Sequence, residues 1–131
     1  RHAGVVRWNP ETETGEHFPC PYTLSGTLYM SFALRDRHEL CGSTYTGNDL
    51  VRFDTRTGEW IGHYRCPQAD ATPTAGGLIH NETLFVSDHL KGRLFPLDLA
   101  TKVWGEPIPV PGYRDWFGYL SGGWPFRGKL Y

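Results

Sequence analysis

The sequence predicts an all-β protein, because short apolar segments alternate with polar turns and one such arrangement recurs along the chain. Three pairs of residues recur 44 positions apart: Asp54 with Asp98, Trp60 with Trp104, and Pro67 with Pro111. No window places apolar residues at the three- and four-residue spacing of an amphipathic helix, so we expect almost no helix. A period of about 40–50 residues in a strand-rich sequence is typical of a propeller blade.

The composition agrees with a single packed domain. The chain has 131 residues, of which 39% are hydrophobic and 15% aromatic, and its 16 glycines and 10 prolines suit many short strands joined by turns. The formal net charge of −1 gives no electrostatic basis for binding nucleic acid. The apolar runs are far too short to span a membrane, so we expect no membrane insertion.

Each complete unit is predicted to contain four strands, named a to d from the inner to the outer edge. Strands c and d form a hairpin, whose turn Asp54 caps with its side chain while Gly58 supplies backbone freedom. In chain order, the expected strands are 29–34, 40–44, 50–53 and 59–66 in one unit and 76–80, 83–87, 94–97 and 103–110 in the next. An N-terminal copy supplies only c and d, at 5–8 and 16–20, and a C-terminal copy only a and b, at 119–124 and 129–131.

The predicted fold is therefore a segment of a β-propeller built from four-stranded antiparallel blades, with two complete blades flanked by two half blades. The expected boundaries are a half blade at 1–25, blades at 26–67 and 68–111, and a half blade at 112–131. Propellers typically have four to eight blades, so three blade-equivalents cannot close a ring. We expect the rest of the propeller to complete it, as more of the same polypeptide, a second chain, or another copy in a homo-oligomer.

The hairpins resemble kelch-type repeats. The matching residues are Phe53-Asp54, Thr57-Gly58-Glu59-Trp60 and Pro67, echoed by Leu97-Asp98, Thr101, Trp104 and Pro111. The glycine pairs at 76–77 and 122–123 are also kelch-like, although they fall in strand a and Ser87-Asp88 follows strand b. Quinoprotein-type and lectin-type blades remain alternatives. The resemblance implies a β-propeller, a fold used both for binding and by several enzymes.

The tryptophans divide into two groups. Trp60 and Trp104 are in register with the repeat, so they are predicted to be blade-packing residues. Trp8 replaces Phe53 in the repeat and is predicted to be structural as well. Trp116 breaks the pattern and lies in a connection from strand d to the next strand a, on the face where propeller ligands dock. Aromatic side chains beside Arg and Asp in a loop suit recognition of a sugar or a protein. The alternative is that Trp116 packs its loop against the next blade.

The candidate binding residues all lie in the d–a and b–c loops: Tyr113, Arg114, Asp115 and Trp116 in one d–a connection, Asp70 in the equivalent connection, and His89 in a b–c loop. No catalytic residue, metal site or cofactor is predicted. His17 and Cys20 repeat the spacing of His63 and Cys66, but residues three apart on a strand point to opposite faces.

The cysteines and one sequon bear on the cellular compartment. A disulfide between Cys20 and Cys41 would cross between neighbouring blades, and the alternative is that the thiols simply pack there. Asn81-Glu82-Thr83 is an N-glycosylation sequon, which is used in secreted proteins. We therefore expect a secreted, extracellular protein that carries a glycan at Asn81.

Two function hypotheses follow. The first is a binding or scaffold module, part of a propeller that recognises protein or glycan through its d–a and b–c loops. The second is a segment of a propeller enzyme, an oxidase, lyase or hydrolase, with its active site in the central channel. The positions that would line that channel, at 27–28, 76–77 and 118–119, lack clustered acids or histidines, which favours binding.

Overall fold

The computed structural model describes residues 3–33, 38–45, 47–68, 71, 78–88, 91–111, 125–126 and 129–130. Every helix-or-strand element in these residues is a β-strand. The first four-stranded sheet has the order β3 (Thr27–Ala33), β4 (Glu39–Tyr45), β5 (Asp49–Asp54) and β6 (Glu59–Arg65), with all neighbours antiparallel. The second has the order β7 (Leu78–His80), β8 (Thr83–Asp88), β9 (Arg93–Asp98) and β10 (Ile108–Pro109).

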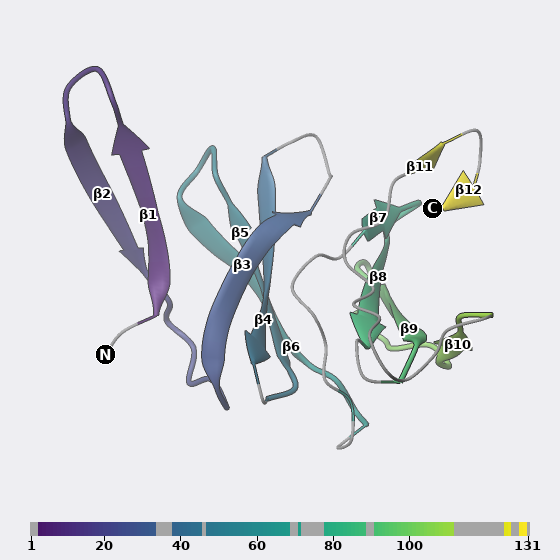
Figure 1. Ribbon diagram of the computed structural model, residues 1–131. Helices are drawn as coiled ribbons and strands as arrows, with labels where there is room; N and C mark the ends of the chain where they lie inside the picture. Colours follow the sequence, from purple (N-terminus) through teal and green to yellow (C-terminus); the bar gives the residue numbers. More distant parts are fainter. Residues whose placement is uncertain are drawn as a thin grey trace.

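Two shorter hairpins flank these sheets (Figure 1). One consists of β1 (Gly4–Asn9) and β2 (Thr14–Pro19), and the other of β11 (Pro125–Phe126) and β12 (Lys129–Leu130). The predicted fold class is thus confirmed: the chain is all-β, with two four-stranded antiparallel blades between two half blades.

One predicted strand differs from the structure. The outer strand expected at 103–110 is interrupted: Trp104 forms one isolated bridge with Leu97, and only Ile108–Pro109 is a strand. Pro107, just before β10, lacks the N–H that a strand ladder needs, which is consistent with the interruption there. The strand expected at 119–124 lies outside the described residues, and the described partner of β12 is Pro125–Phe126.

The hairpin turns between β5 and β6 and after β9 are closed by aspartate side chains, as predicted. Asp54 Oδ1 accepts from the backbone N–H of Arg56 at 2.8 Å, and Asp98 Oδ1 accepts from the N–H of Ala100 at 2.9 Å. Each turn then contains a left-handed residue, Gly58 with φ 76° and Lys102 with φ 61°. Local sequence therefore fixes where each outer hairpin reverses.

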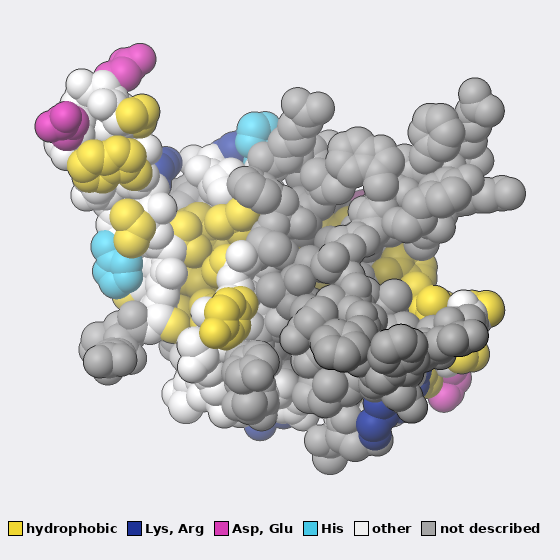
Figure 2. Space-filling model, in the orientation of Figure 1, with side chains coloured by type: hydrophobic (Ala, Val, Ile, Leu, Met, Phe, Trp, Pro, Cys, Tyr) yellow, Lys and Arg dark blue, Asp and Glu magenta, His cyan; other side chains and the backbone are white. Residues whose placement is uncertain are grey.

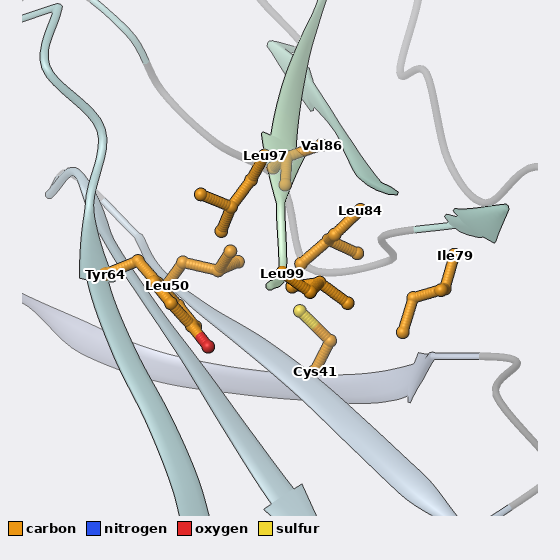
Figure 3. Packing of buried hydrophobic residues seen from close by; sticks show 8 residues of the cluster. All are labelled: Cys41, Leu50, Tyr64, Ile79, Leu84, Val86, Leu97 and Leu99. Carbon is orange, nitrogen blue, oxygen red and sulfur yellow. The ribbon is translucent and has the colours of Figure 1, made fainter. Parts of the chain in front are cut away.

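The main core lies between the two blades (Figure 3). Cys41, Leu50 and Tyr64 of the first blade pack with side chains of the second, namely Ile79, Leu84, Val86, Leu97 and Leu99. Trp104 packs against this cluster, as its register predicted. On the other side of the first blade, Phe18 of β2 contacts Phe53, with 5.4 Å between ring centroids. Blades are thus joined face to face by apolar side chains.

Candidate functional site

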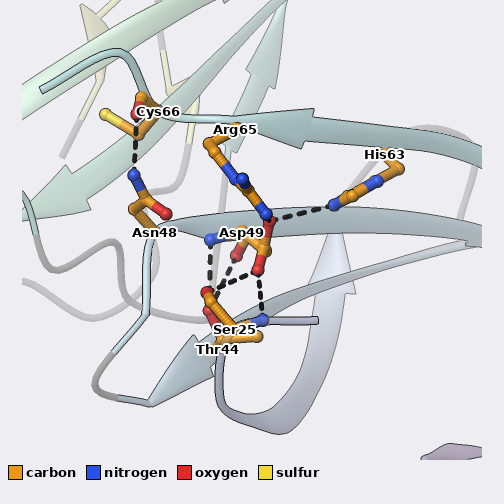
Figure 4. A network of polar contacts seen from close by, with 7 residues as sticks. All are labelled: Ser25, Thr44, Asn48, Asp49, His63, Arg65 and Cys66. Atoms are coloured by element: carbon orange, nitrogen blue, oxygen red, sulfur yellow. Dashed lines mark hydrogen bonds and ion pairs between the residues drawn. The ribbon is translucent and has the colours of Figure 1, made fainter. Parts of the chain in front are cut away.

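A polar network lies at one edge of the first blade, where β4 ends and β5 begins (Figure 4). The antiparallel register pairs Thr27 with Tyr45 and Asp49 with Arg65, so the start of β3 and the end of β6 lie at this same edge. This edge therefore carries a b–c turn and the d–a connections. These are the loops through which the sequence predicts ligand binding.

Asp49 is the centre of this network and is completely buried. Its Oδ2 accepts from the Ser25 backbone N–H at 2.6 Å and from the Ser25 hydroxyl at 2.5 Å. Its Oδ1 contacts His63 Nε2 at 3.0 Å and accepts from Arg65 Nε and Nη2, each at 3.1 Å. The Asp49 N–H donates to Thr44 Oγ1 at 3.1 Å. Both carboxylate oxygens are therefore satisfied inside the protein.

The donors keep the Asp49 carboxylate ionised. Burial alone raises the pKa of Asp49, but hydrogen bonds from Ser25, His63 and Arg65 outweigh that effect and lower it from 3.8 to about 2. The hydroxyl of Ser25 bonds to Asp49 rather than to His63, so the network lacks the nucleophile-to-base contact of a serine hydrolase. The arrangement orients side chains instead of moving a proton between Ser25 and His63.

The side chains so oriented reach the surface. The Arg65 side chain is 60% exposed and that of His63 27%, although Asp49 beneath them is inaccessible. The imidazole of His63 also stacks on the ring of Tyr22, with centroids 4.8 Å apart and planes 24° apart. A buried anion thus holds a cation and an aromatic pair at the edge of the blade.

A similar polar contact lies at the same edge of the second blade, but there the repeat position of Asp49 is occupied by an arginine. Arg93, 44 residues after Asp49, donates from Nη2 to the buried carboxylate of Asp88 at 2.5 Å. Its Nη1 donates to Gln68 Oε1 at 2.9 Å, and Gln68 belongs to the connection that follows β6. Asp49 and Arg93 therefore each bind a residue of the connection that precedes their blade. Asp49 binds Ser25, and Arg93 binds Gln68.

Sequence reasoning did not identify these residues. The repeat-equivalent placement of Asp49 and Arg93, each just after a polar turn, was the available signal. The binding residues predicted from the sequence lie outside the described residues: Tyr113, Arg114, Asp115, Trp116, Asp70 and His89.

Asn81 and the cysteines are described. Asn81 is exposed in the two-residue turn between β7 and β8, where Asn81 and Glu82 have φ of 48° and 60°. Cys20 is half-buried, and Cys41 packs in the core between the blades. The disulfide considered between them stays a prediction.

No group of three or more His, Cys, Asp or Glu side chains among the described residues could hold a metal ion. No helix within this part of the chain is long and apolar enough to cross a membrane.

Comparison with solved structures shows the fold. AztD from Citrobacter koseri matches with a TM-score of 0.58 and 17% identity, over 85% of this chain and 31% of that one. Virginiamycin B lyase from Staphylococcus aureus matches with a TM-score of 0.60 and 16% identity, over 83% and 35%. A streptogramin B lyase matches with a TM-score of 0.57 and 18% identity, over 82% and 34%.

These structures are β-propellers, and the chain spans about a third of their length. At these identities the likeness shows the fold alone. No protein-family model and no curated protein matches the sequence.

Proposed function

We propose that the chain is a binding module of a β-propeller that recognises protein or glycan through its b–c turns and d–a connections. This proposal is supported by the exposed Arg65 and the half-buried His63, both held in place by the buried Asp49. Binding residues on loops that a rigid scaffold positions are the usual arrangement for recognition. The loop residues 113–116, Asp70 and His89 belong to the same proposed surface.

The alternative is a segment of a propeller enzyme. The likeness to two lyase structures favours it, because their fold accommodates an active site. The described network favours binding, because its Ser and His both bond to the aspartate and not to each other. Turnover of a substrate by the complete propeller, abolished by a substitution in the channel, would favour the enzyme.

A glycan array of defined oligosaccharides tests the binding proposal. We expect His63→Ala and Trp116→Ala to reduce binding of recognised glycans by about tenfold or more, as for residues central to an interface. Arg56→Gln is the matched control, because Arg56 is also 60% exposed and ion-paired to an aspartate but lies at the opposite end of the blade.

Equal binding by wild-type protein and both face variants would contradict the proposal for glycans, and the same variants then serve to test a protein ligand. A loss of stability of about 3 kcal/mol or more in Trp116→Ala would show that this residue packs as a core aromatic.

We also propose that further blades cover the β1–β2 hairpin and complete the ring. β1 corresponds in the repeat to β5 and β9. Val51 and Phe53 of β5 are 0% and 2% exposed, and Phe95 and Leu97 of β9 are 1% and 0% exposed. The equivalent Val6 and Trp8 of β1 are 63% and 58% exposed. Hydrophobic side chains accordingly lie open along this hairpin (Figure 2).

The exposure of Trp8 departs from the prediction that it is a structural residue, and a preceding blade would supply the missing contact. The edge of the hairpin supports the same proposal, because β1 hydrogen-bonds to β2 alone among the described strands. An unpaired strand edge readily accepts another strand. A groove of about 220 Å³ also remains between this half blade and the first blade, lined in part by Val5, Phe18 and Phe53.

We propose, finally, that the protein is secreted and glycosylated at Asn81. The exposed turn that holds Asn81 would present its side chain to the modifying enzyme. Peptide mass spectrometry of protein secreted from eukaryotic cells should find a glycan on the peptide that contains Asn81. Finding only the unmodified peptide would contradict this localisation.

A further inference from the structure

Arg65 presents an uncommitted part of its guanidinium to solvent. Its Nε and Nη2 both donate to Asp49 Oδ1, whereas none of the described residues accepts from Nη1. The edge formed by Nη1 and the second N–H of Nη2 is the fork that matches a carboxylate in geometry. Because the buried aspartate already fixes this fork, little side-chain entropy is lost when a ligand binds it.

His63 lies two residues before Arg65 on β6, and its Nε2 contacts the same Asp49 Oδ1. Asp49 is ionised at neutral pH because its pKa is about 2, and an ionised carboxylate only accepts hydrogen bonds. The hydrogen in the contact between His63 and Asp49 is therefore on Nε2, and in the neutral ring Nδ1 is an acceptor. Figure 4 shows Arg65 and His63 approaching the same side chain of Asp49. Stacking on Tyr22 fixes the imidazole as well.

We infer that Arg65 and His63 form a subsite for a hydroxy acid group, such as acidic sugars carry. The ligand carboxylate accepts from Nη1 and Nη2 of Arg65, and a neighbouring hydroxyl donates to Nδ1 of His63. A carboxylate without a hydroxyl uses only half of the subsite, and a neutral sugar uses only the other half. This inference rests on the proposed binding function and names the ligand class for the same face.

Calorimetric titration of the protein with glucuronate, glucose, acetate and 3-hydroxybutyrate tests the inference. We expect glucuronate to bind and Arg65→Gln to weaken it about 10- to 100-fold, the factor for losing a hydrogen bond to a charged group. The affinity of Arg65→Lys for glucuronate should lie between those of the wild type and Arg65→Gln, because lysine keeps the charge but lacks the fork of two donors. Arg56→Gln should bind glucuronate as the wild type does.

The comparison of ligands shows whether the subsite recognises a simple hydroxy acid or an acidic sugar. Equal affinity for 3-hydroxybutyrate and glucuronate assigns the subsite to the hydroxy acid alone, whereas tighter binding of glucuronate assigns it to an acidic sugar. Glucose or acetate binding as tightly as glucuronate, or Arg65→Gln binding like wild type, overturns the inference. Thermal unfolding of Arg65→Gln and Arg65→Lys confirms that both variants are folded before they are titrated.

Failure of the subsite is distinguishable from failure of the binding function. If Trp116→Ala weakens binding on the glycan array but Arg65→Gln does not, the binding function stands and the subsite is wrong. If neither variant changes binding, this face is not the binding surface.

Discussion

Replacing Glu39 with glutamine should lower the free energy of unfolding by about 3–5 kcal/mol, because it leaves the charge of Arg52 buried without its counter-charge. Both side chains are buried in the first blade. Arg52 Nε bonds to Glu39 Oε1, its Nη2 donates to Oε2 at 2.9 Å, and its Nη1 donates to the Tyr64 hydroxyl at 3.1 Å. Urea unfolding of the wild type and the variant measures the difference.

Two further variants define what this result means. Glu59→Gln changes an exposed glutamate on β6 and should alter stability by no more than about 0.5 kcal/mol. Replacing Glu39 and Arg52 together with methionine removes both charges and should recover most of the stability lost in the single variant. A cost below about 1 kcal/mol for Glu39→Gln would show that Arg52 finds solvent or another partner.

Asp49→Asn should lower the free energy of unfolding by about 2–4 kcal/mol at neutral pH. The substitution removes a buried anion that accepts from Ser25, His63 and Arg65, and it turns one oxygen into an amide donor that faces other donors. Asp98→Asn is the matched control, because Asp98 is exposed and asparagine caps a turn as well as aspartate does. The same urea unfolding experiment measures both.

The pH dependence of this difference follows from the lowered pKa of Asp49. A carboxyl whose pKa is about 2 in the folded protein and 3.8 otherwise stabilises the fold above pH 4, and this contribution is lost as the pH falls toward 2. The stability gap between wild type and Asp49→Asn should therefore shrink over that interval. A gap that stays constant from pH 5 to pH 2 would contradict the role given to the ionised carboxylate.

The strands and turns of the blades could be predicted because their signals are local. Asp54 and Asp98 cap their turns through atoms two residues away, and Trp104 occupies the packing position that its register indicates. The sequence also contains a signal for the broken outer strand of the second blade, because Pro107 lies in the gap before β10. A repeat of fixed length then arranged these pieces into blades.

The candidate site could not be predicted because its parts are distant in sequence. Ser25 precedes Asp49 by 24 residues and Arg65 follows it by 16, so no short motif contains the network. Only the pairing of β5 with β6, together with the chain entering β3, brings these side chains to one edge. The sequence did indicate the face, because connections between blades gather there in any propeller.

We propose that this chain is one arc of a ring whose other blades cover the β1–β2 hairpin. An experimental structure of the protein in its native assembly tests it most directly, with its size in dilute solution measured alongside. We expect a further strand paired with the free edge of β1 and a sheet packed on Val6 and Trp8. A well-folded monomer of these 131 residues with Val6 and Trp8 in solvent would contradict the claim.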